Sequence, residues 1–213
     1  ISAELVLGIG LALYLRSLTS HWRNICLTIF MIPMVATPIA TALSWRLMLN
    51  SNIGVINYLI ELVGIQAPEW TSSPWLAMFT IVMVDVWQWT PLVIMIVYAG
   101  LLSISPKLYE AARMDSATGW ATFWHITLPQ IQYMVAIAAV FRLMRSFRSF
   151  DIIWLVTQGG PGTATEILNV YLYRVAFVFL KGGKAAALGI ILLGITIGVC
   201  MSILRVLRVQ GNS

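Results

Sequence analysis

Polar side chains at helical spacing interrupt two apolar stretches, and these are the residues whose types could do chemistry. In residues 75–102, Asp85, Gln88 and Trp89 stand at i, i+3 and i+4, so they share one helix face. A second set shares a face within residues 133–156: Arg142, Arg145, Ser146 and Ser149. Charged groups at bilayer depth are costly and by default face a cavity or a partner. The two faces could therefore line a polar path, in which hydroxyls meet hydrogen-bond donors and acceptors and Trp89 offers a ring for stacking.

The same charges also fit a purely structural role. Asp85 could form a salt bridge with Arg142 or Arg145 and hold two helices together. Residue types and spacing leave both interpretations open.

Composition indicates the elements that must carry these residues. Hydrophobic residues make up 60% of the 213 positions and charged residues 10%, with a mean hydropathy of +0.88. A soluble globular chain has about 25% charged residues, so much of this surface must meet lipid. Four apolar runs reach the about 20 residues that a spanning helix needs. They are residues 25–49, 75–102, 133–156 and 185–204. We therefore predict an all-α, polytopic transmembrane helical bundle.

Two shorter apolar segments do not fit a full span. Residues 1–15 are too short to cross a bilayer, and the chain starts at Ile1 rather than Met. We interpret this run as part of a helix that begins before the given sequence. Residues 166–180 are interrupted by Arg174, and we expect them to lie at the outer face or to line a cavity.

Basic residues predict the orientation. They cluster in three regions that the positive-inside rule assigns to the cytoplasm: Arg16 and Arg23, Lys107 and Arg113, Arg205 and Arg208. The loop 50–74 has no Lys or Arg and is predicted outside. Helix parity also places residues 158–184 outside, despite their three basic residues. The net charge of +5 forms no basic stripe, so we predict no nucleic-acid partner. We also predict no catalytic or metal site, because the cysteines and histidines lack ligand spacing.

The loop 103–132 carries the most specific motif. Ser105-Pro106 is a helix start, because Ser caps and Pro suits the first turn. A short helix is predicted over Lys107–Asp115, with small residues at its centre that let another protein approach closely. We expect a turn over residues 116–119, a second short helix over 120–128 and a boundary at Pro129. A helix-turn-helix of this kind on a membrane domain is typical of a docking element.

This loop resembles the EAA loop of permease subunits in binding-protein-dependent ABC importers. The resemblance rests on Glu110-Ala111-Ala112, Ile126 and Leu128-Pro129. The family usually has Gly where this chain has Ser116, so we expect Gly119 to supply the flexible turn. The resemblance implies a cytoplasmic coupling loop, residues 103–132, that contacts an ATPase. The implied contact residues are Leu108, Glu110, Ala111, Ala112, Ser116, Gly119, Ile126, Leu128 and Pro129.

Other segments resemble the carbohydrate branch of this family, which includes the maltose and multiple-sugar permeases. They are residues 50–57, residues 87–91, Phe150-Asp151 and residues 157–161. Within the last segment, Gly159, Gly160 and Pro161 form either a plain tight turn or a contact with a solute-binding protein.

The resemblance implies that residues 1–213 form an ABC transporter permease domain that lacks its first span, in the cell membrane with the C-terminus in the cytoplasm. Its implied partners are a second permease subunit in a heterodimer, two ATPase subunits and a solute-binding protein, beside the lipid bilayer. The chain contains no G-x-x-x-x-G-K-[ST] phosphate loop. We therefore expect no cofactor in this chain, and ATP-Mg on the separate ATPase subunits.

Two other classes of membrane protein remain as alternatives to an ABC permease. An ion-coupled secondary transporter could use Asp85 or Asp151 as its cation site, but it would not need the cytoplasmic loop. A membrane-embedded enzyme would need a cluster of His, Asp or Ser near one interface, and the sequence suggests none. A glycerol phosphate, a polyol or an amino acid remains open as substrate beside a di- or oligosaccharide.

Overall fold

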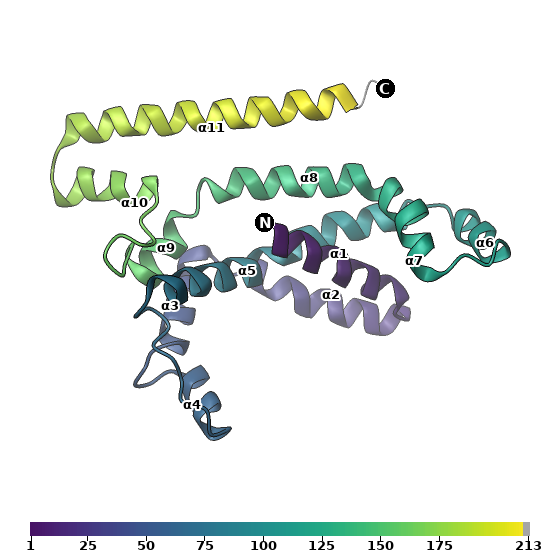
Figure 1. The fold of residues 1–213 in the computed structure, drawn as a ribbon, viewed down its shortest axis with the longest axis horizontal. Coiled ribbons are helices and arrows are strands. Elements are labelled where there is room, and N and C mark those ends of the chain that lie inside the picture. Colours follow the sequence, from purple (N-terminus) through teal and green to yellow (C-terminus); the bar gives the residue numbers. More distant parts are fainter. Residues whose placement is uncertain (211–213) are drawn as a thin grey trace. The chain divides into compact units, whose positions relative to one another are not determined.

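The computed structural model describes the backbone of residues 1–210 and the side chains of residues 1–199, 201 and 202. Every regular element in this part of the chain is helical, which confirms the predicted all-α class (Figure 1). The elements are α1 (Ser2–Ser17), α2 (Ser20–Val35), α3 (Pro38–Met48), α4 (Val55–Leu62), α5 (Pro74–Leu102), α6 (Pro106–Met114), α7 (Gly119–Thr122), a π-helical turn (Phe123–Thr127), α8 (Leu128–Ser146), α9 (Phe150–Thr157), α10 (Leu168–Tyr173), a second π-helical turn (Arg174–Val178) and α11 (Gly182–Gln210).

Three helices in the described residues are long and apolar enough to cross a bilayer: Pro74–Leu102, Gly119–Ser146 and Gly182–Val199. The first and third agree with the apolar runs predicted from the sequence. The predicted span 25–49 is wrong as a single helix, because α2 and α3 bend by 95° at the break between them. Thr37 is extended there and caps α3, whose first residue is Pro38. Proline disfavours helical geometry in the residue before it, which explains why the helix breaks at this point.

The predicted span 133–156 is also wrong in its limits. The helix begins fourteen residues earlier, at Gly119, and it ends at Ser146. A turn over residues 147–149 then separates it from α9, with the Arg148 N–H donating to the Arg145 carbonyl at 2.8 Å. Arginines and serines at this end of the run favour a turn over a further apolar helix.

Pro129 is likewise not the predicted boundary, because it lies in the first turn of α8 and the helix runs through it. The π-helical turn Phe123–Thr127 precedes it directly, and its register is shown by the Leu128 N–H, which donates to the Phe123 carbonyl. Proline removes one helical donor and crowds the carbonyl four residues earlier. A wider turn at this point accommodates the ring without ending the helix.

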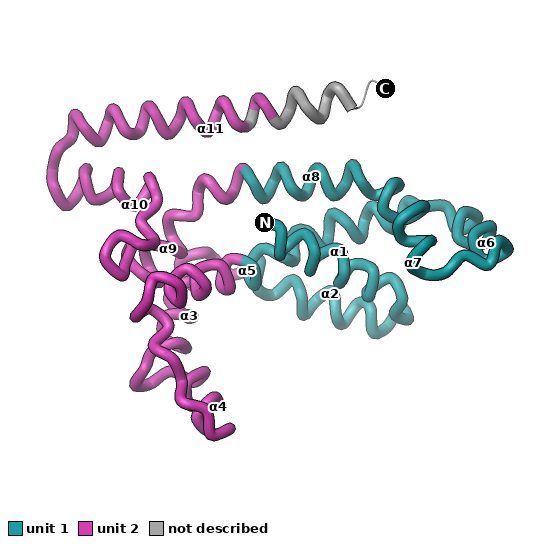
Figure 2. The backbone as a smooth tube through the Cα atoms, viewed as in Figure 1, with its two compact units in different colours: residues 1–35, 86–143 teal, residues 36–85, 144–213 magenta. Residues whose placement is uncertain are grey.

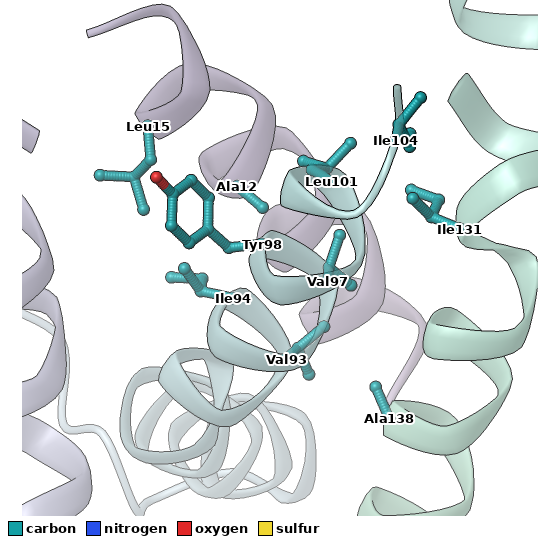
Figure 3. Close-up of a cluster of buried hydrophobic side chains, with 10 residues drawn as sticks. All are labelled: Ala12, Leu15, Val93, Ile94, Val97, Tyr98, Leu101, Ile104, Ile131 and Ala138. Carbon is teal, nitrogen blue, oxygen red and sulfur yellow. The ribbon is translucent and has the colours of Figure 1, made fainter. Parts of the chain in front are cut away.

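The chain forms two compact units, described here separately (Figure 2). Unit 1 contains residues 1–35 and 86–143, and unit 2 contains residues 36–85 and 144–213. The core of unit 1 joins α1, the second half of α5 and α8 through ten buried side chains (Figure 3): Ala12, Leu15, Val93, Ile94, Val97, Tyr98, Leu101, Ile104, Ile131 and Ala138. The helices approach closely, since a Cβ on Gly8 would lie 2.5 Å from Val93 Cγ1.

Unit 2 has its own core, built mainly where α3 packs on α9. Its buried members are Ala42, Ile81, Val84, Ile152, Ile153, Val156 and Val170. The segment 166–180 forms α10 and the second π-helical turn, and Arg174 Nη1 pairs with Glu166 Oε1 at 2.8 Å. Asn169, Leu172, Tyr173 and Phe177 of this segment line a groove of about 530 Å³, whereas its location at an outer face stays a prediction.

Candidate functional sites

The predicted EAA loop contains α6, which starts where the sequence predicted. Ser105 precedes the helix and Pro106 is its first residue. The helix ends in a Schellman motif: the Ala117 N–H donates to the Ala112 carbonyl at 2.9 Å, and the Ser116 N–H to the Arg113 carbonyl at 3.1 Å. This motif requires a left-handed residue at C′, the first position after the helix cap, and Ser116 occupies it with φ +53°. Glycine is the residue that fills this position at the lowest cost.

The expectation that Gly119 supplies the flexible turn is therefore wrong. Gly119 is the first residue of α7, and Thr118 caps that helix by accepting a hydrogen bond from the Ala121 N–H at 3.2 Å. The strain of the turn falls on Ser116, the position that glycine usually holds in the family. A Ser in the C′ position directly after a short helix was the sequence signal for it.

Ser116→Gly is expected to stabilise the end of α6 by about 1 kcal/mol, because a side chain in the left-handed region costs about that much. The amide of Ala117, which closes the Schellman motif, reports the change. Its hydrogen exchange is expected to slow about fivefold. Ser105→Gly is the matched control, since Ser105 has φ −59° and makes no capping bond through its side chain. If the Ala117 amide exchanged at the same rate in Ser116→Gly and wild type, the left-handed backbone of Ser116 would not be strained.

One side chain anchors α6 to the rest of unit 1. The Tyr109 hydroxyl accepts a hydrogen bond from Arg16 Nη1 of α1 and lies 3.1 Å from Thr127 Oγ1 in the π-helical turn. The Arg16 guanidinium carbon also lies 4.0 Å from the centre of the Tyr109 ring. Ala112 is buried on the anchored side. These contacts hold the face of α6 with Tyr109 and Ala112 against the rest of unit 1, so the opposite face of α6 is exposed.

The outward face of the loop carries most of the predicted coupling residues. Side chains are exposed at Leu108, Glu110, Ala111, Ser116, Gly119 and Pro129, and half-buried at Ile126 and Leu128. A carboxylate beside an exposed alanine offers a hydrogen-bond acceptor on a shallow surface. The geometry thus permits close approach by another protein, while the assignment of these residues to coupling stays a prediction.

The second candidate site is a buried ion pair in unit 1. Arg142 of α8 is 1% exposed, and its Nε and Nη2 donate to the two carboxylate oxygens of Glu4 of α1, which is 0% exposed. The Arg142 guanidinium carbon lies 5.8 Å from the centre of the Trp89 ring, and Gln88 is buried in the same unit. Bidentate geometry satisfies both charges in a region from which water is excluded.

The sequence reasoning missed Glu4 and considered only Asp85 as a carboxylate partner. A lone Glu inside the apolar run 1–15 was the signal that could have identified it. The other predicted path residues differ in burial. Asp85 and Ser149 are half-buried, whereas Arg145 and Ser146 are exposed. Their lining of a path stays a prediction.

The third candidate site is a cavity of about 340 Å³ in unit 2, here called the Gly-Gly-Pro pocket. Gly160 and Pro161 form part of its wall, and its other lining residues come from α3, the following loop, α5 and α9. These are Arg46, Leu49, Asn50, Ser51, Trp70, Thr71, Thr80, Val156, Thr157 and Gln158. Amides, hydroxyls and one guanidinium make the pocket predominantly polar.

Asn50 and Ser51 line this pocket, and Gly54 and Asn57 fix the backbone of Asn50 behind it. Asn57 is buried, donates from Nδ2 to the Asn50 carbonyl at 3.1 Å, and accepts from Trp70 Nε1 at 2.7 Å. A Cβ on Gly54 would lie 2.4 Å from the Asn50 carbonyl oxygen, so only glycine fits. The residues that carried the likeness to the carbohydrate branch therefore fix the local backbone. Among the described residues, no three His, Cys, Asp or Glu side chains form a metal-binding group.

Comparisons with known proteins agree with these features. The sequence profile of the family described as "Binding-protein-dependent transport system inner membrane component" matches residues 4–210. The trehalose/maltose transport system permease protein MalF of Thermococcus litoralis is 35% identical over 174 residues, 82% of this chain and 59% of that protein. The probable ABC transporter permease protein y4oQ of Sinorhizobium fredii is 36% identical over 188 residues, 88% of this chain and 60% of that protein. The chain thus spans about 60% of the length of these relatives.

Solved structures share the fold. A chain of a bacterial ABC transporter involved in import of the acidic polysaccharide alginate superposes with a TM-score of 0.83 at 25% identity, covering 94% of this chain and 71% of that one. The bacterial alginate transporter in complex with an alginate pentasaccharide-bound periplasmic protein gives a TM-score of 0.82, covering 93% and 70%. With a family profile that matches nearly the whole chain and apolar helices of spanning length, the protein is a multi-pass membrane protein that belongs to the family of binding-protein-dependent transport system inner membrane components.

Proposed function

We propose that the chain is the permease subunit of an ATP-driven importer that translocates a di- or oligosaccharide delivered by a solute-binding protein. The observation that carries this proposal is α6, a short helix fixed to its unit through Tyr109 while Glu110 and Ala111 face outward. An ion-driven carrier has no need of such a docking face. The sugar assignment is supported by the relatives named for trehalose, maltose and alginate transport.

The proposal includes the partners and the orientation. Two ATPase subunits, which hold ATP-Mg, bind the predicted EAA loop in the cytoplasm, and a second, distinct permease subunit completes the path. The solute-binding protein docks outside, over the Gly-Gly-Pro pocket. Support for this receptor comes from the solved alginate transporter, which was captured with its periplasmic protein. The polar wall of the pocket suits the reversible, wet contacts of a transient partner.

The ion pair bears on the class of substrate. Arg142 is neutralised by Glu4, so it does not offer a free positive charge to an anion. Hydroxyl recognition by neutral polar groups is therefore favoured over recognition of a phosphate by this arginine. Together with the relative named for trehalose and maltose, this pairing supports a neutral sugar as the first substrate to test.

Transport by the full-length protein in its complex, reconstituted in vesicles with its receptor, tests the function. Uptake of a radiolabelled disaccharide from a panel that includes maltose and trehalose is expected to require ATP on the side of the EAA loop. Ionophores that collapse proton and sodium gradients are expected to leave uptake unchanged. Uptake that continues without ATP and stops with an ionophore would establish the ion-coupled alternative instead.

A further inference from the structure

A large groove in unit 1 borders the inner side of the predicted EAA loop and shares Tyr109, Glu110 and Gly119 with it. Its volume is about 1120 Å³, and it runs between α1 on one side and the start of the Gly119–Ser146 helix on the other. On α1 its wall includes Val6, Gly10 and Leu13, which recur at helical spacing on one face. On the facing helix the wall includes Trp120 and Trp124, one turn apart. Two matched apolar helix faces thus border an open space.

Charge is confined to one end of this groove. Arg16 follows Leu13 on the same face of α1, and Arg113 and Glu110 of α6 lie on the same rim. The Arg16 guanidinium already donates to Tyr109. Arg113 has no ion-pair or side-chain hydrogen-bond partner within the described part of the chain, and its side chain is exposed. Two guanidinium groups and one carboxylate give the groove a net positive charge, and its other lining residues are uncharged and mostly apolar.

The dimensions match one leaflet of a bilayer. Val6 and Arg16 are ten residues apart, which corresponds to about 15 Å along a helix. The hydrocarbon core of a bilayer is about 30 Å thick, so one leaflet contributes about 15 Å. An acyl chain laid along this wall would therefore bring its headgroup to the level of the arginines.

The aromatic residues point to the same depth. Trp120, Phe123 and Trp124 form one cluster, with ring centres 5.5–6.1 Å apart, and the two tryptophans are 72% and 48% exposed. Tryptophan prefers the boundary between the hydrocarbon and the headgroups of a membrane. The cluster belongs to the first residues of the Gly119–Ser146 helix, and all three of its residues line the groove. This is the position at which a lipid headgroup meets its acyl chain.

We propose that this groove binds one phospholipid with an anionic headgroup, its acyl chain along α1 and its phosphate at Arg113. The occupant is a lipid rather than a peptide, because the apolar wall is a single stripe of leaflet length that ends in cationic groups. A bound lipid would contact α1 and α6 together. It would thereby link the composition of the cytoplasmic leaflet to the position of the short helix, independently of which sugar is carried.

Native mass spectrometry of the full-length protein in its complex tests the proposal. The delipidated complex is supplied with phosphatidylglycerol or with phosphatidylcholine at equal concentration, and retained lipid is counted. Wild type is expected to retain phosphatidylglycerol about fivefold more than phosphatidylcholine, the preference that one basic residue near a headgroup gives. Arg113→Gln is expected to remove this preference, whereas Arg23→Gln, on α2 outside the groove, is expected to keep it.

A second pair of variants tests the groove itself. No atom lies within 4 Å of a Cβ on Gly10, so Gly10→Phe fills the groove without a clash at its Cβ. It is expected to lower retention of both lipids by one molecule. Leu7→Phe, on the same helix but outside the groove, is expected to have no effect. Equal retention of the two lipids by wild type, or unchanged retention by Gly10→Phe, would overturn the proposal. Should Gly10→Phe fail to assemble, the wild-type and Arg113→Gln measurements still decide it.

Discussion

Glu4→Leu is expected to prevent the protein from accumulating in the membrane in a folded form. Arg142 is 1% exposed, and this variant removes Glu4, the buried carboxylate that accepts hydrogen bonds from its Nε and Nη2. Removing one member of a buried pair costs roughly 3–5 kcal/mol, which is comparable with much of the stability of a domain. The nearby Trp89 ring offers only a small compensation. The measurement is the amount of monodisperse, detergent-extracted protein and its melting temperature.

The double variant Glu4→Leu/Arg142→Leu separates charge from packing. It removes both buried charges, and apolar replacements of a buried pair are often neutral or stabilising. We expect it to accumulate close to the wild-type level and to melt well above the single variant. Glu61→Leu is the control, because Glu61 is exposed at the end of α4 and its loss should change stability little. A single variant as stable as wild type would show that the pair does not hold α1 to α8.

Ala111→Arg is expected to abolish the stimulation of ATP hydrolysis by the loaded solute-binding protein. Ala111 is exposed at the centre of α6, so a long cationic side chain is tolerated by the fold and blocks close approach of another protein. Receptor-stimulated hydrolysis is expected to fall at least about tenfold, which corresponds to about 1.4 kcal/mol of lost coupling. Co-purification of the ATPase with the permease subunits measures the docking directly.

Ala111→Ser provides the matched control, because it keeps the residue small and is expected to retain both association and stimulated hydrolysis. Glu110→Ala is expected to fall between the two, since it removes an acceptor without adding bulk. Normal association and hydrolysis in Ala111→Arg would show that α6 is not the coupling element. The result also tests the orientation, because ATP is present only on the cytoplasmic side.

Local chemistry made part of this structure predictable. Ser105-Pro106 marked the start of α6 correctly, because a first-turn proline acts on its own backbone, although the Ser105 side chain makes no capping hydrogen bond. Two long apolar runs predicted α5 and the last helix, because bilayer thickness fixes the length of a span. Pro38 was the sequence signal for the bend between α2 and α3, since proline restricts the backbone of the residue before it. The prediction of one span over residues 25–49 did not use this signal, because the apolar run continues on both sides of the proline.

Features that depend on tertiary contacts were not predictable in the same way. Glu4 and Arg142 are separated by 138 positions, and no spacing rule relates them. Pro129 looked like a boundary because proline ordinarily ends a helix, but a π-helical turn accommodates it. The left-handed turn was predicted at Gly119 rather than at Ser116 because serine rarely adopts a left-handed conformation, and the backbone hydrogen bonds around Ser116 show that it does so here.

The unbroken course of the Gly119–Ser146 helix through Pro129 has a mechanical consequence. If the helix broke at the proline, the break would act as a hinge. A movement of the loop would then bend the hinge and would not move the helix beyond it. The continuous helix has 28 residues, a rod of about 42 Å at 1.5 Å per residue. Tyr109 contacts this rod near one end, at Thr127. We therefore expect a displacement of α6 to be passed along the continuous helix beyond Pro129.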